Sequence, residues 1–301
     1  MIENEGSGVL PVYKPTGMTS HDVVSKMRKL YGTKKVGHTG TLDPDACGLL
    51  LILIGRAVKA SEYITAGRKF YRAGLRLGIT TDTEDTSGNI LTECDDIPDK
   101  EKVLEAVSKF RGDIMQVPPM YSALKVGGQK LCDLARRGIT VDRPARPITV
   151  YHLEADGFGK DYTLEVSCSA GTYIRTLCAD IGKELGCGGA MSSLLRTETG
   201  GFTLDSAHTL EELESLSQEQ RYSLLVPVEK LFEELPSITF PEFFEKLATN
   251  GVEIYQKKIG TKFEADTLLR VFSKNGAFIG LAKVGEYQNG SAIKIVKFLN
   301  V

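Results

Sequence analysis

The chain has 301 residues, of which 42% are apolar and 25% are charged, values typical of a soluble globular protein with room for two domains. Its longest apolar run, residues 49–54, is far shorter than the roughly 18 residues of a membrane span, and its acidic start lacks the features of a signal peptide. Six scattered cysteines without a Cys-x-x-Cys pair indicate neither a zinc site nor a disulfide framework. We therefore expect a cytoplasmic protein with no metal site and no membrane attachment.

The net charge of −2 hides segments of opposite sign. By formal count, residues 1–80 carry +6 and residues 121–150 carry +4, whereas residues 81–120 carry −6 and residues 205–249 carry −7. A polyanion such as a nucleic acid is attracted to the basic segments and repelled by the acidic ones. Ordinary solvated surface produces the same counts, so charge alone leaves both interpretations open.

The first elements predicted along the chain are a short apolar stretch, a turn and a helix. Residues 9–13 are mostly apolar, and the Lys-Pro-Thr-Gly sequence at 14–17 has turn chemistry. Apolar residues then recur at helical spacing up to Tyr31, and Gly32 can end the helix. Ser20 is the expected N-cap, because its hydroxyl can accept hydrogen bonds from the free N–H groups of the first turn.

A glycine-rich loop at 34–48 separates this helix from the most apolar part of the chain. Residues 49–54 predict a buried strand, and residues 56–66 predict a short helix. Residues 70–78 alternate between apolar and polar side chains, which predicts a half-buried strand. Residues 98–110 place apolar side chains on one stripe, which predicts an amphipathic helix.

The next segment, residues 117–150, differs in amino-acid composition from the rest of the chain. It is rich in proline and glycine and holds the second basic cluster, so we expect an exposed and partly mobile insertion. Beyond it, alternation at 162–168 predicts a strand. Helical spacing at 174–185 predicts a helix that ends at Gly186.

The pattern changes once more near residue 235. Strand-like runs at 268–272, 278–284 and 292–298 are separated by two Asn-Gly turns. Such short, regularly spaced strands are typical of a small, mostly β domain of about 65 residues at the end of the chain.

The candidate catalytic segment is the loop from Gly37 to Gly48. It places one carboxylate, Asp43, directly before Pro44, which restricts the backbone of Asp43 to extended angles and gives its side chain a defined direction. Glycines on either side let the backbone approach a ligand closely. The segment is not a Walker phosphate loop, because no Gly-Lys-Ser/Thr follows. From these residues alone, a structural turn capped by an aspartate explains the pattern at least as well as a site.

The same segment resembles the catalytic motif of the bacterial tRNA pseudouridine-55 synthase (TruB) family, Gly-His-x-Gly-x-Leu-Asp-Pro-x-Ala-x-Gly, in order and spacing. The resemblance extends over about residues 8–230, and the C-terminal piece is similar, with weaker signals, to a PUA domain. Several ordered motifs along one chain are far more specific than one short pattern. The further stretches that resemble the family are residues 14–20, 69–72, 77–83, 110–112, 119–125, 146–150 and 168–175.

The resemblance implies an α+β fold with two domains. Residues 1–234 would form the pseudouridine synthase catalytic domain, a large mixed, mainly antiparallel sheet flanked by helices. Its basic insertion at about 120–150 would act as a flap over the RNA. Residues 235–301 would form a small β-rich, PUA-like RNA-binding domain.

The resemblance also implies an activity. The family isomerises the T-loop uridine at position 55 of tRNA to pseudouridine: the glycosidic C–N bond breaks, the uracil rotates, and it is rejoined through carbon. No cofactor is implied. The implied partner is the T-arm of tRNA, bound by a monomer that requires no protein partner and no guide RNA. The short N-terminus and the lack of long basic tails favour such a stand-alone enzyme over the guide-dependent relatives.

Asp43 is implied to be the catalytic carboxylate, which attacks the ring or the sugar or removes a sugar proton. Arg175 matches the arginine that pairs with it, and its charge would favour the ionised form that a dry pocket otherwise disfavours. The less favoured alternative is that Arg175 is a surface helix residue. Asp45 and Cys47 depart from the commoner residues of the motif, and we expect Asp45 to point to solvent.

Four further residues are implied to bind the substrate. Tyr71 matches the tyrosine that stacks on the target base, and Tyr173 matches a second substrate-contacting tyrosine. Leu195 aligns with an apolar residue that lines the base pocket. His38 matches the histidine placed against the RNA loop once the uridine is extruded, which costs a few kcal/mol of stacking. By composition alone, the two tyrosines and the leucine would be core residues.

Basic residues of the first 80 residues and of the insertion are predicted to contact phosphates. Lys14 is included among these, as a supporting residue of the site. RNA readout would depend on shape and extruded bases, because the A-form major groove is too narrow to read. The predicted phosphate contacts are Lys14, Lys34, Lys35, Arg68, Lys69 and the basic residues of 125–146.

Two other functions remain open from the sequence. A non-catalytic tRNA-binding or tRNA-folding protein would need only the basic clusters and a PUA-like domain. A hydrolase could use Asp43 to cleave the N-glycosidic bond and release the free base.

Overall fold

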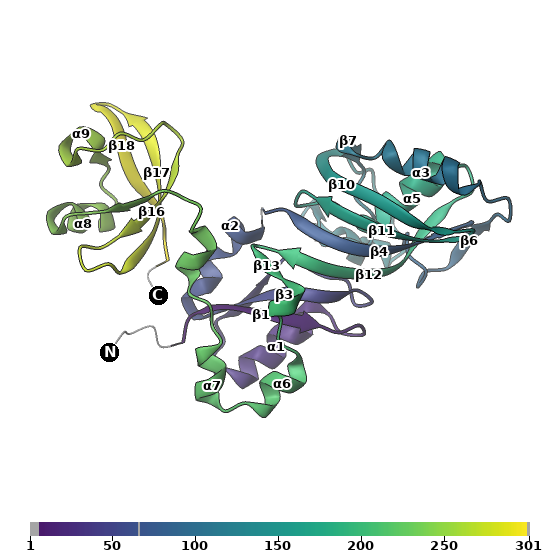
Figure 1. Cartoon of the computed structure of the whole chain (residues 1–301), viewed down its shortest axis with the longest axis horizontal. Coiled ribbons are helices and arrows are strands. Elements are labelled where there is room, and N and C mark those ends of the chain that lie inside the picture. Colours follow the sequence, from purple (N-terminus) through teal and green to yellow (C-terminus); the bar gives the residue numbers. More distant parts are fainter. Residues whose placement is uncertain (1–5, 66, 300–301) are drawn as a thin grey trace.

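The computed structural model describes residues 6–65 and 67–299 and contains two main sheets of unequal size (Figure 1). The large sheet has nine strands. Within the described residues, its only parallel pair of strands is β3 (Cys47–Ile54) with β12 (Gly189–Thr199). The predicted mixed, mainly antiparallel sheet is therefore confirmed. In pairing order its strands are β1 (Gly8–Lys14), β3 (Cys47–Ile54), β12 (Gly189–Thr199), β4 (Lys69–Leu77), β11 (Asp161–Cys168), β10 (Arg146–Phe158) and β7 (Gly112–Gln116), with β2 (Val36–Thr39) beside β3 and β13 (Phe202–Thr203) beside β12.

Helices cover the large sheet on both faces at its β1–β3 end. The 50, 52 and 54 positions of β3 pack against helix α1 (Ser20–Leu30), and the 49, 51 and 53 positions pack against η1 (Gly55–Ala60) and α2 (Ser61–Thr65). Because both faces of β3 are buried, its sequence is continuously apolar rather than alternating. The predicted helix over 56–66 is thus a 3-10 turn followed by a short α-helix, and residue 66 lies outside the described residues.

The other half of the large sheet buries one face only. Strand β4 alternates as predicted, with Tyr71 and Leu75 in the core and Arg72 exposed. The buried face packs against α3 (Lys100–Ser108) and α5 (Ile174–Glu184), which lie over this end of the sheet in Figure 1. Both helices lie within their predicted ranges.

The start of α1 differs from the prediction. Its N-cap is Thr19, whose side chain accepts from the N–H of Asp22, while the carboxylate of Asp22 accepts from the N–H of Thr19. This reciprocal capping box satisfies two backbone donors. Ser20 is the first helical residue, and its buried hydroxyl bonds to Leu42 instead. The assignment of Ser20 as the N-cap was wrong by one residue, because both positions carry a hydroxyl that can cap.

The insertion contains little regular structure. A two-stranded hairpin and one short helix interrupt an otherwise exposed segment, and its apolar Leu131 and Leu134 are buried. Another small hairpin, β5 (Ile79–Thr81) with β6 (Ile90–Glu93), projects from the end of β4. The predicted mobility of the insertion stays a prediction. The elements of the insertion are β8 (Lys125–Val126), β9 (Gln129–Lys130) and α4 (Leu131–Ala135).

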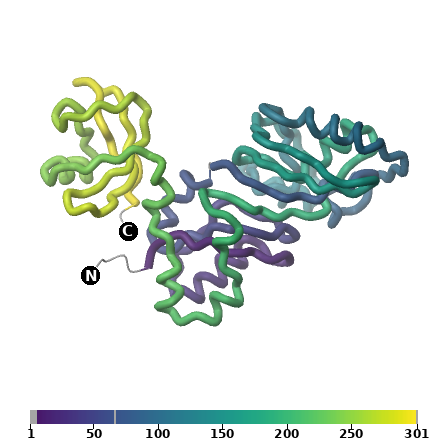
Figure 2. The backbone as a smooth tube through the Cα atoms, in the orientation of Figure 1, coloured from purple at the N-terminus to yellow at the C-terminus, as the bar shows by residue number. Residues whose placement is uncertain are grey.

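A connecting segment leads from the large sheet to the C-terminal sheet, and Figure 2 shows it as the green tube that runs alongside β1 before the yellow end. Its elements are η2 (Leu204–Ser206), α6 (Leu210–Ser215), α7 (Gln218–Ser223) and η3 (Val228–Phe232). Backbone hydrogen bonds join Val9 to Val226 in both directions, so this segment is held against the first strand.

The C-terminal sheet has five strands and its own apolar core. The three predicted strands are present, and the second and third are joined at Tyr287 and Gly290 in a tight hairpin. A second cluster contains Phe278 and Leu281 of this sheet together with Phe232 and Leu51, so the two parts of the chain pack against each other. The elements are β14 (Ser237–Thr239), α8 (Glu242–Thr249), β15 (Ile254–Tyr255), α9 (Gln256–Ile259), β16 (Leu268–Phe272), β17 (Phe278–Tyr287) and β18 (Gly290–Phe298).

No helix within the described ranges is long and apolar enough to cross a membrane.

Candidate active site

Asp43 lies in the loop between β2 and β3, and the residues on both sides of it are fixed. The Ser20 hydroxyl accepts from the N–H of Leu42 at 2.9 Å and donates to the carbonyl of the same residue at 3.1 Å. On the other side, the carbonyl of Pro44 accepts from the N–H of Gly17 at 2.9 Å. The backbone of Asp43 is therefore held from the helix and from the turn that precedes it.

Lys14 adds a further tie to this loop. Its ammonium donates to the carbonyls of Pro15 at 2.9 Å, Met18 at 2.6 Å and Pro44 at 3.2 Å, and its side chain is fully buried. Burial is also the main cause that lowers the pKa of Lys14. All three ammonium donors are used by backbone oxygens, so the predicted contact between Lys14 and a phosphate is wrong.

Lys69 repeats this arrangement in β4. Its ammonium donates to the carbonyls of Thr65 at 2.8 Å and Gly67 at 3.1 Å, and the residue is only 6% exposed. Burial, with the charge of Arg196 adding to it, lowers the pKa of Lys69 to about 8. Two of its three ammonium donors are used by backbone oxygens, and its burial leaves little surface for the predicted phosphate contact. Its place on the core face follows from the alternation of β4, which also buries Tyr71.

Arg175, in the first turn of α5, contacts Asp43 directly. Its Nε lies 2.9 Å from Asp43 Oδ2 and 3.8 Å from Asp85 Oδ2. Its Nη1 donates to the carbonyl of Thr83 at 3.1 Å, and its Nη2 donates to the carbonyl of Tyr121 at 2.8 Å. The planar fork of one guanidinium thus joins the motif loop, the segment after β5 and the start of the insertion.

The exposure of the two partners differs sharply. The side chain of Arg175 is 6% exposed, whereas that of Asp43 is 40% exposed. The ion pair with a buried guanidinium fixes the position of the carboxylate. The exposed part of the Asp43 side chain remains accessible to a bound molecule. Asp45, two residues later, points to solvent as expected.

Tyr71 lies on the core face of β4 and is 8% exposed. Burial raises the pKa of its phenol, so the ring carries no charge at neutral pH. In the register of β4 with β12, Tyr71 stands opposite Arg196, and residues directly opposite each other point to the same face. The aromatic ring therefore belongs to the side of the sheet that carries α5 and Arg175.

Leu195 lies on the other face of the sheet. It pairs with the exposed Arg72, whereas Leu194 pairs with Ala73 and packs in the cluster that contains Tyr71. The Leu195 side chain lies against Gly48 at the end of the motif loop. That it lines the base pocket stays a prediction.

Tyr173 is the residue before the first turn of α5 and is half-buried. Burial raises the pKa of its phenol. His38 lies in β2, and its Nδ1 is buried without a hydrogen-bond partner among the described residues. Burial lowers the pKa of His38, so its imidazole is mostly neutral at pH 7.

Arg196 is a component of the site that was not assigned from the sequence. It is fully buried, and it donates from Nε to the carbonyl of Leu49 at 2.8 Å and from Nη2 to the carbonyl of Gly40 at 2.9 Å. A side chain on Gly48 would lie 2.4 Å from the carbonyl oxygen of Arg196, so only glycine permits the close parallel contact of β3 and β12. An arginine at an inward position of an apolar strand was the signal that could have identified it.

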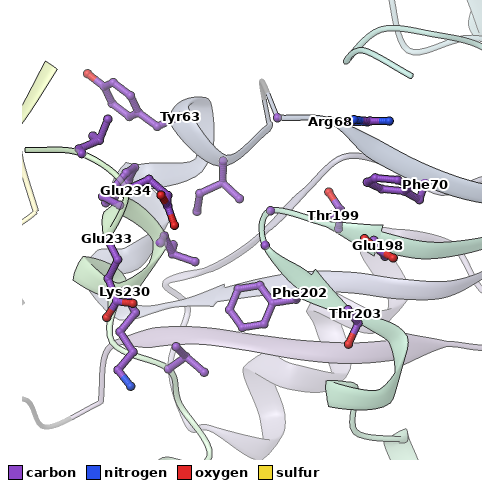
Figure 3. A pocket seen from close by; sticks show the side chains of 18 of the residues that line it. Tyr63, Arg68, Phe70, Glu198, Thr199, Phe202, Thr203, Lys230, Glu233 and Glu234 are labelled. Atoms are coloured by element: carbon purple, nitrogen blue, oxygen red, sulfur yellow. The ribbon is translucent and has the colours of Figure 1, made fainter. Parts of the chain in front are cut away.

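A separate hollow of about 810 Å3 lies outside the Asp43 site (Figure 3). It is bounded by Phe202 and Glu198 from the β12–β13 hairpin and by Lys230 from η3. At its edge, the exposed guanidinium of Arg68 lies 4.8 Å from the ring centres of both Phe70 and Tyr151. An exposed guanidinium can reach a phosphate, so the predicted phosphate contact of Arg68 stays a prediction.

Within the described ranges, no three His, Cys, Asp or Glu side chains gather closely enough to hold a metal ion.

Two family models match this chain. The model described as "TruB family pseudouridylate synthase (N terminal domain)" matches residues 28–174, and "tRNA pseudouridylate synthase B C-terminal domain" matches residues 175–233. The tRNA pseudouridine synthase B of Alkaliphilus oremlandii is 43% identical over 301 residues, covering 97% of this chain and 98% of that protein. The protein of the same name from Bacillus licheniformis is 44% identical and covers 90% of each chain.

Solved structures resemble the chain over its length. One described as "Crystal Structure of a Cbf5-Nop10-Gar1 Complex" has a TM-score of 0.70 at 26% identity, covering 97% of this chain and 84% of that one. Another, "Structure of H/ACA RNP bound to a substrate RNA containing 2'-deoxyuridine", has a TM-score of 0.70 at 23% identity and the same coverage. The second likeness supports the fold alone.

Proposed function

This chain belongs to the TruB family of pseudouridine synthases, and from that premise we propose that it isomerises the uridine at position 55 in the T-loop of tRNA. The chain is a tRNA pseudouridine synthase, an isomerase. The observation that carries the choice of catalytic residue is the half-exposed carboxylate of Asp43 in contact with the buried guanidinium of Arg175. The non-catalytic alternative is not favoured, since binding alone does not require this pair.

In the proposed reaction, the bond between C1′ of the ribose and N1 of the uracil breaks, and a bond between C1′ and C5 forms. The proton that leaves C5 is balanced by a proton gained at N1, so the product is an isomer of the substrate. Asp43 either attacks the ring or the sugar, or removes a sugar proton, and each act needs the ionised carboxylate. The contact with Arg175 supports that charge in a site that excludes water.

The uridine must leave its stack to reach this carboxylate, at a cost of a few kcal/mol. We assign Tyr71 to stacking on the extruded base and Leu195, which lies against Gly48 of the motif loop, to the apolar wall of the base pocket. Tyr173 contacts the substrate from the start of α5. His38 binds the RNA loop that the uridine leaves.

The rest of the tRNA would contact surfaces outside this pocket. The exposed basic residues of the insertion would bind phosphates as a flap over the T-arm, and residues 235–301 would act as a PUA-like domain that follows the catalytic domain, residues 1–234. The five-stranded sheet with its own core supports that boundary. We further propose that the protein acts in the cytoplasm as a monomer, without cofactor, guide RNA or protein partner. Support comes from relatives of the same length that are each named as one synthase.

The proposal is tested by incubating unmodified tRNA with the protein and mapping pseudouridine by position. We expect one new pseudouridine, at position 55, and no free uracil. Free uracil would support the hydrolase alternative, and unmodified tRNA would contradict the proposal. In the same assay, Leu195→Ala should lower kcat/KM by about tenfold, because a truncated apolar wall loses roughly 1–3 kcal/mol.

A further inference from the structure

Gln116 is a buried amide at the point where the chain leaves the large sheet for the insertion. It is the last residue of the edge strand β7 and is 2% exposed, while its neighbours Met115 and Val117 are 63% and 45% exposed. A strand alternates, so Gln116 points inward where the residues before and after it point to solvent. An uncharged polar side chain in such a place requires hydrogen-bond partners.

Both ends of the Gln116 amide bond to the backbone of one residue, Tyr173. The N–H of Tyr173 donates to Gln116 Oε1 at 2.8 Å, and Gln116 Nε2 donates to the carbonyl of Tyr173 at 3.0 Å. The Gln116 side chain thus makes the two backbone hydrogen bonds that a neighbouring strand would otherwise make. Two opposed hydrogen bonds fix the orientation of the peptide groups on either side of Tyr173, which one bond alone would leave free to rotate.

The residue held in this way determines where α5 begins. Tyr173 has an extended backbone, with φ −100° and ψ 110°, and its side chain does not cap the helix. Its carbonyl also accepts the N–H of Leu177 at 3.0 Å, which is the first turn of the helix. The two hydrogen bonds from Gln116 to the backbone of Tyr173 therefore set both the direction of the Tyr173 ring and the start of the turn that carries Arg175.

We propose that Gln116 is a positioning residue for the reaction, acting through the backbone of Tyr173 to place the Tyr173 ring and the guanidinium of Arg175 against Asp43. The inference rests on the proposed function and adds a residue that touches neither the RNA nor the reacting atoms. The contact it controls is the 2.9 Å approach of Arg175 Nε to Asp43 Oδ2. Five residues further along the same segment, the carbonyl of Tyr121 accepts from Arg175 Nη2, so the start of the insertion holds the arginine as well.

The chain offers a matched control in Gln256 of the C-terminal sheet. Gln256 is 4% exposed, its Oε1 accepts the N–H of Phe263 at 2.7 Å, and its Nε2 donates to the carbonyl of Phe263 at 3.0 Å. Its Nε2 also donates to the hydroxyl of Ser291 at 2.8 Å. Loss of this amide should reduce stability at least as much as loss of the Gln116 amide, but at a place that has no contact with Asp43.

The first experiment compares Gln116→Met and Gln256→Met in single-turnover modification of tRNA at saturating enzyme. Gln116→Met should slow the reaction by about 10²-fold, the cost of a misplacement of roughly 1 Å at the reacting groups. Its Kd for tRNA should stay at the wild-type value, and Gln256→Met should react at the wild-type rate. Equal rates for Gln116→Met and the wild type, or equal slowing by both variants, would overturn the proposal. A wild-type protein that makes no pseudouridine would instead refute the proposed function.

The second experiment needs neither tRNA nor activity. The Nε–H resonance of Arg175, identified by its loss in Arg175→Lys, should shift in Gln116→Met and keep its position in Gln256→Met. An unshifted resonance in Gln116→Met would contradict a positioning role even if the reaction were slow. Should Gln116→Met not fold, Gln116→Glu replaces it in both experiments with the same expected results, because a carboxylate cannot donate to the carbonyl of Tyr173.

Discussion

Two groups of basic side chains in this molecule have opposite surroundings. The core cations, Lys14, Lys69, Arg175 and Arg196, are at most 6% exposed and donate to backbone carbonyls. The insertion cations are exposed to solvent and lie on a segment with little regular structure. The insertion cations are Lys125, Lys130, Arg136, Arg137 and Arg146.

The comparison shows that a positive charge has one role when it is buried and another when it is exposed. A buried ammonium or guanidinium that binds several carbonyls holds the surrounding chain in place and is too buried to contact a phosphate. An exposed one can form the sequence-independent phosphate contacts on which RNA affinity depends. Loss of a core cation should therefore change catalysis or stability, and loss of an insertion cation should change affinity and its dependence on salt.

Among substitutions of the cations, the largest effect should follow Arg175→Lys. A lysine keeps the charge but cannot contact Asp43, Thr83 and Tyr121 at once, because it lacks the planar fork. We expect kcat to fall by about 10²–10³-fold, the range seen when one preorganised donor is removed from an active site. Single-turnover modification of tRNA measures this. The control is Arg72→Lys, an exposed arginine of β4 paired with Glu165, and an equal loss in both variants would remove the distinction between buried and exposed arginines.

Lys14→Met should reduce stability more than any substitution of an insertion cation. The change leaves the carbonyls of Pro15 and Met18 without a hydrogen-bond donor. It also removes the hydrogen bond to the carbonyl of Pro44. We expect the free energy of unfolding to decrease by about 2–3 kcal/mol, the cost of unsatisfied buried acceptors. Urea denaturation measures the change. Lys29→Met, at an exposed position of α1, should stay within about 0.5 kcal/mol of the wild type, and a similar loss there would contradict the interpretation.

The reverse pattern is expected for the insertion. Replacing Lys125 and Lys130 with alanine should weaken tRNA binding and reduce the slope of log Kd against log salt by about 0.7–0.9 for each phosphate that the variant no longer neutralises. The single-turnover rate at saturating enzyme should not change. Binding titrations at several salt concentrations test this. An unchanged salt slope would show that these side chains do not contact phosphates.

The smallest effect concerns pH and Lys69. Because burial lowers the pKa of Lys69 to about 8, the unfolded chain, in which lysine titrates near 10.4, binds more protons at intermediate pH. The free energy of unfolding contributed by Lys69 should therefore rise with pH from about 8 to 10. In urea denaturation, the difference between the wild type and Lys69→Met should grow in favour of the wild type from pH 7.5 to 9.5. A difference that stays constant or shrinks would be inconsistent with a buried ammonium.

Much of the fold could be predicted, because apolar periodicity is local. The alternation of β4 and the helical stripes of α1 and α5 specified their elements to within a few residues. The short strand β2, residues Val36–Thr39, was predicted as loop, since four residues beside glycines carry too little pattern. Ser20 was taken for a cap because Thr19 and Ser20 are chemically alike, and only the tertiary contact with Leu42 separates them.

The candidate site could be predicted only at residues that belong to motifs of the family. Asp43 and Arg175 are 132 positions apart in the sequence, and the resemblance, not periodicity, brought them together. Lys14 and Lys69 were assigned to phosphates because the carbonyls that they bind become neighbours only in the folded chain.

The most direct test of the account is Asp43→Asn, assayed for tRNA binding and for pseudouridine at position 55 in the same preparation. Asparagine keeps the size of the side chain and removes the charge that Arg175 holds. The account predicts wild-type affinity for tRNA and no pseudouridine. Full modification of tRNA by Asp43→Asn would contradict it.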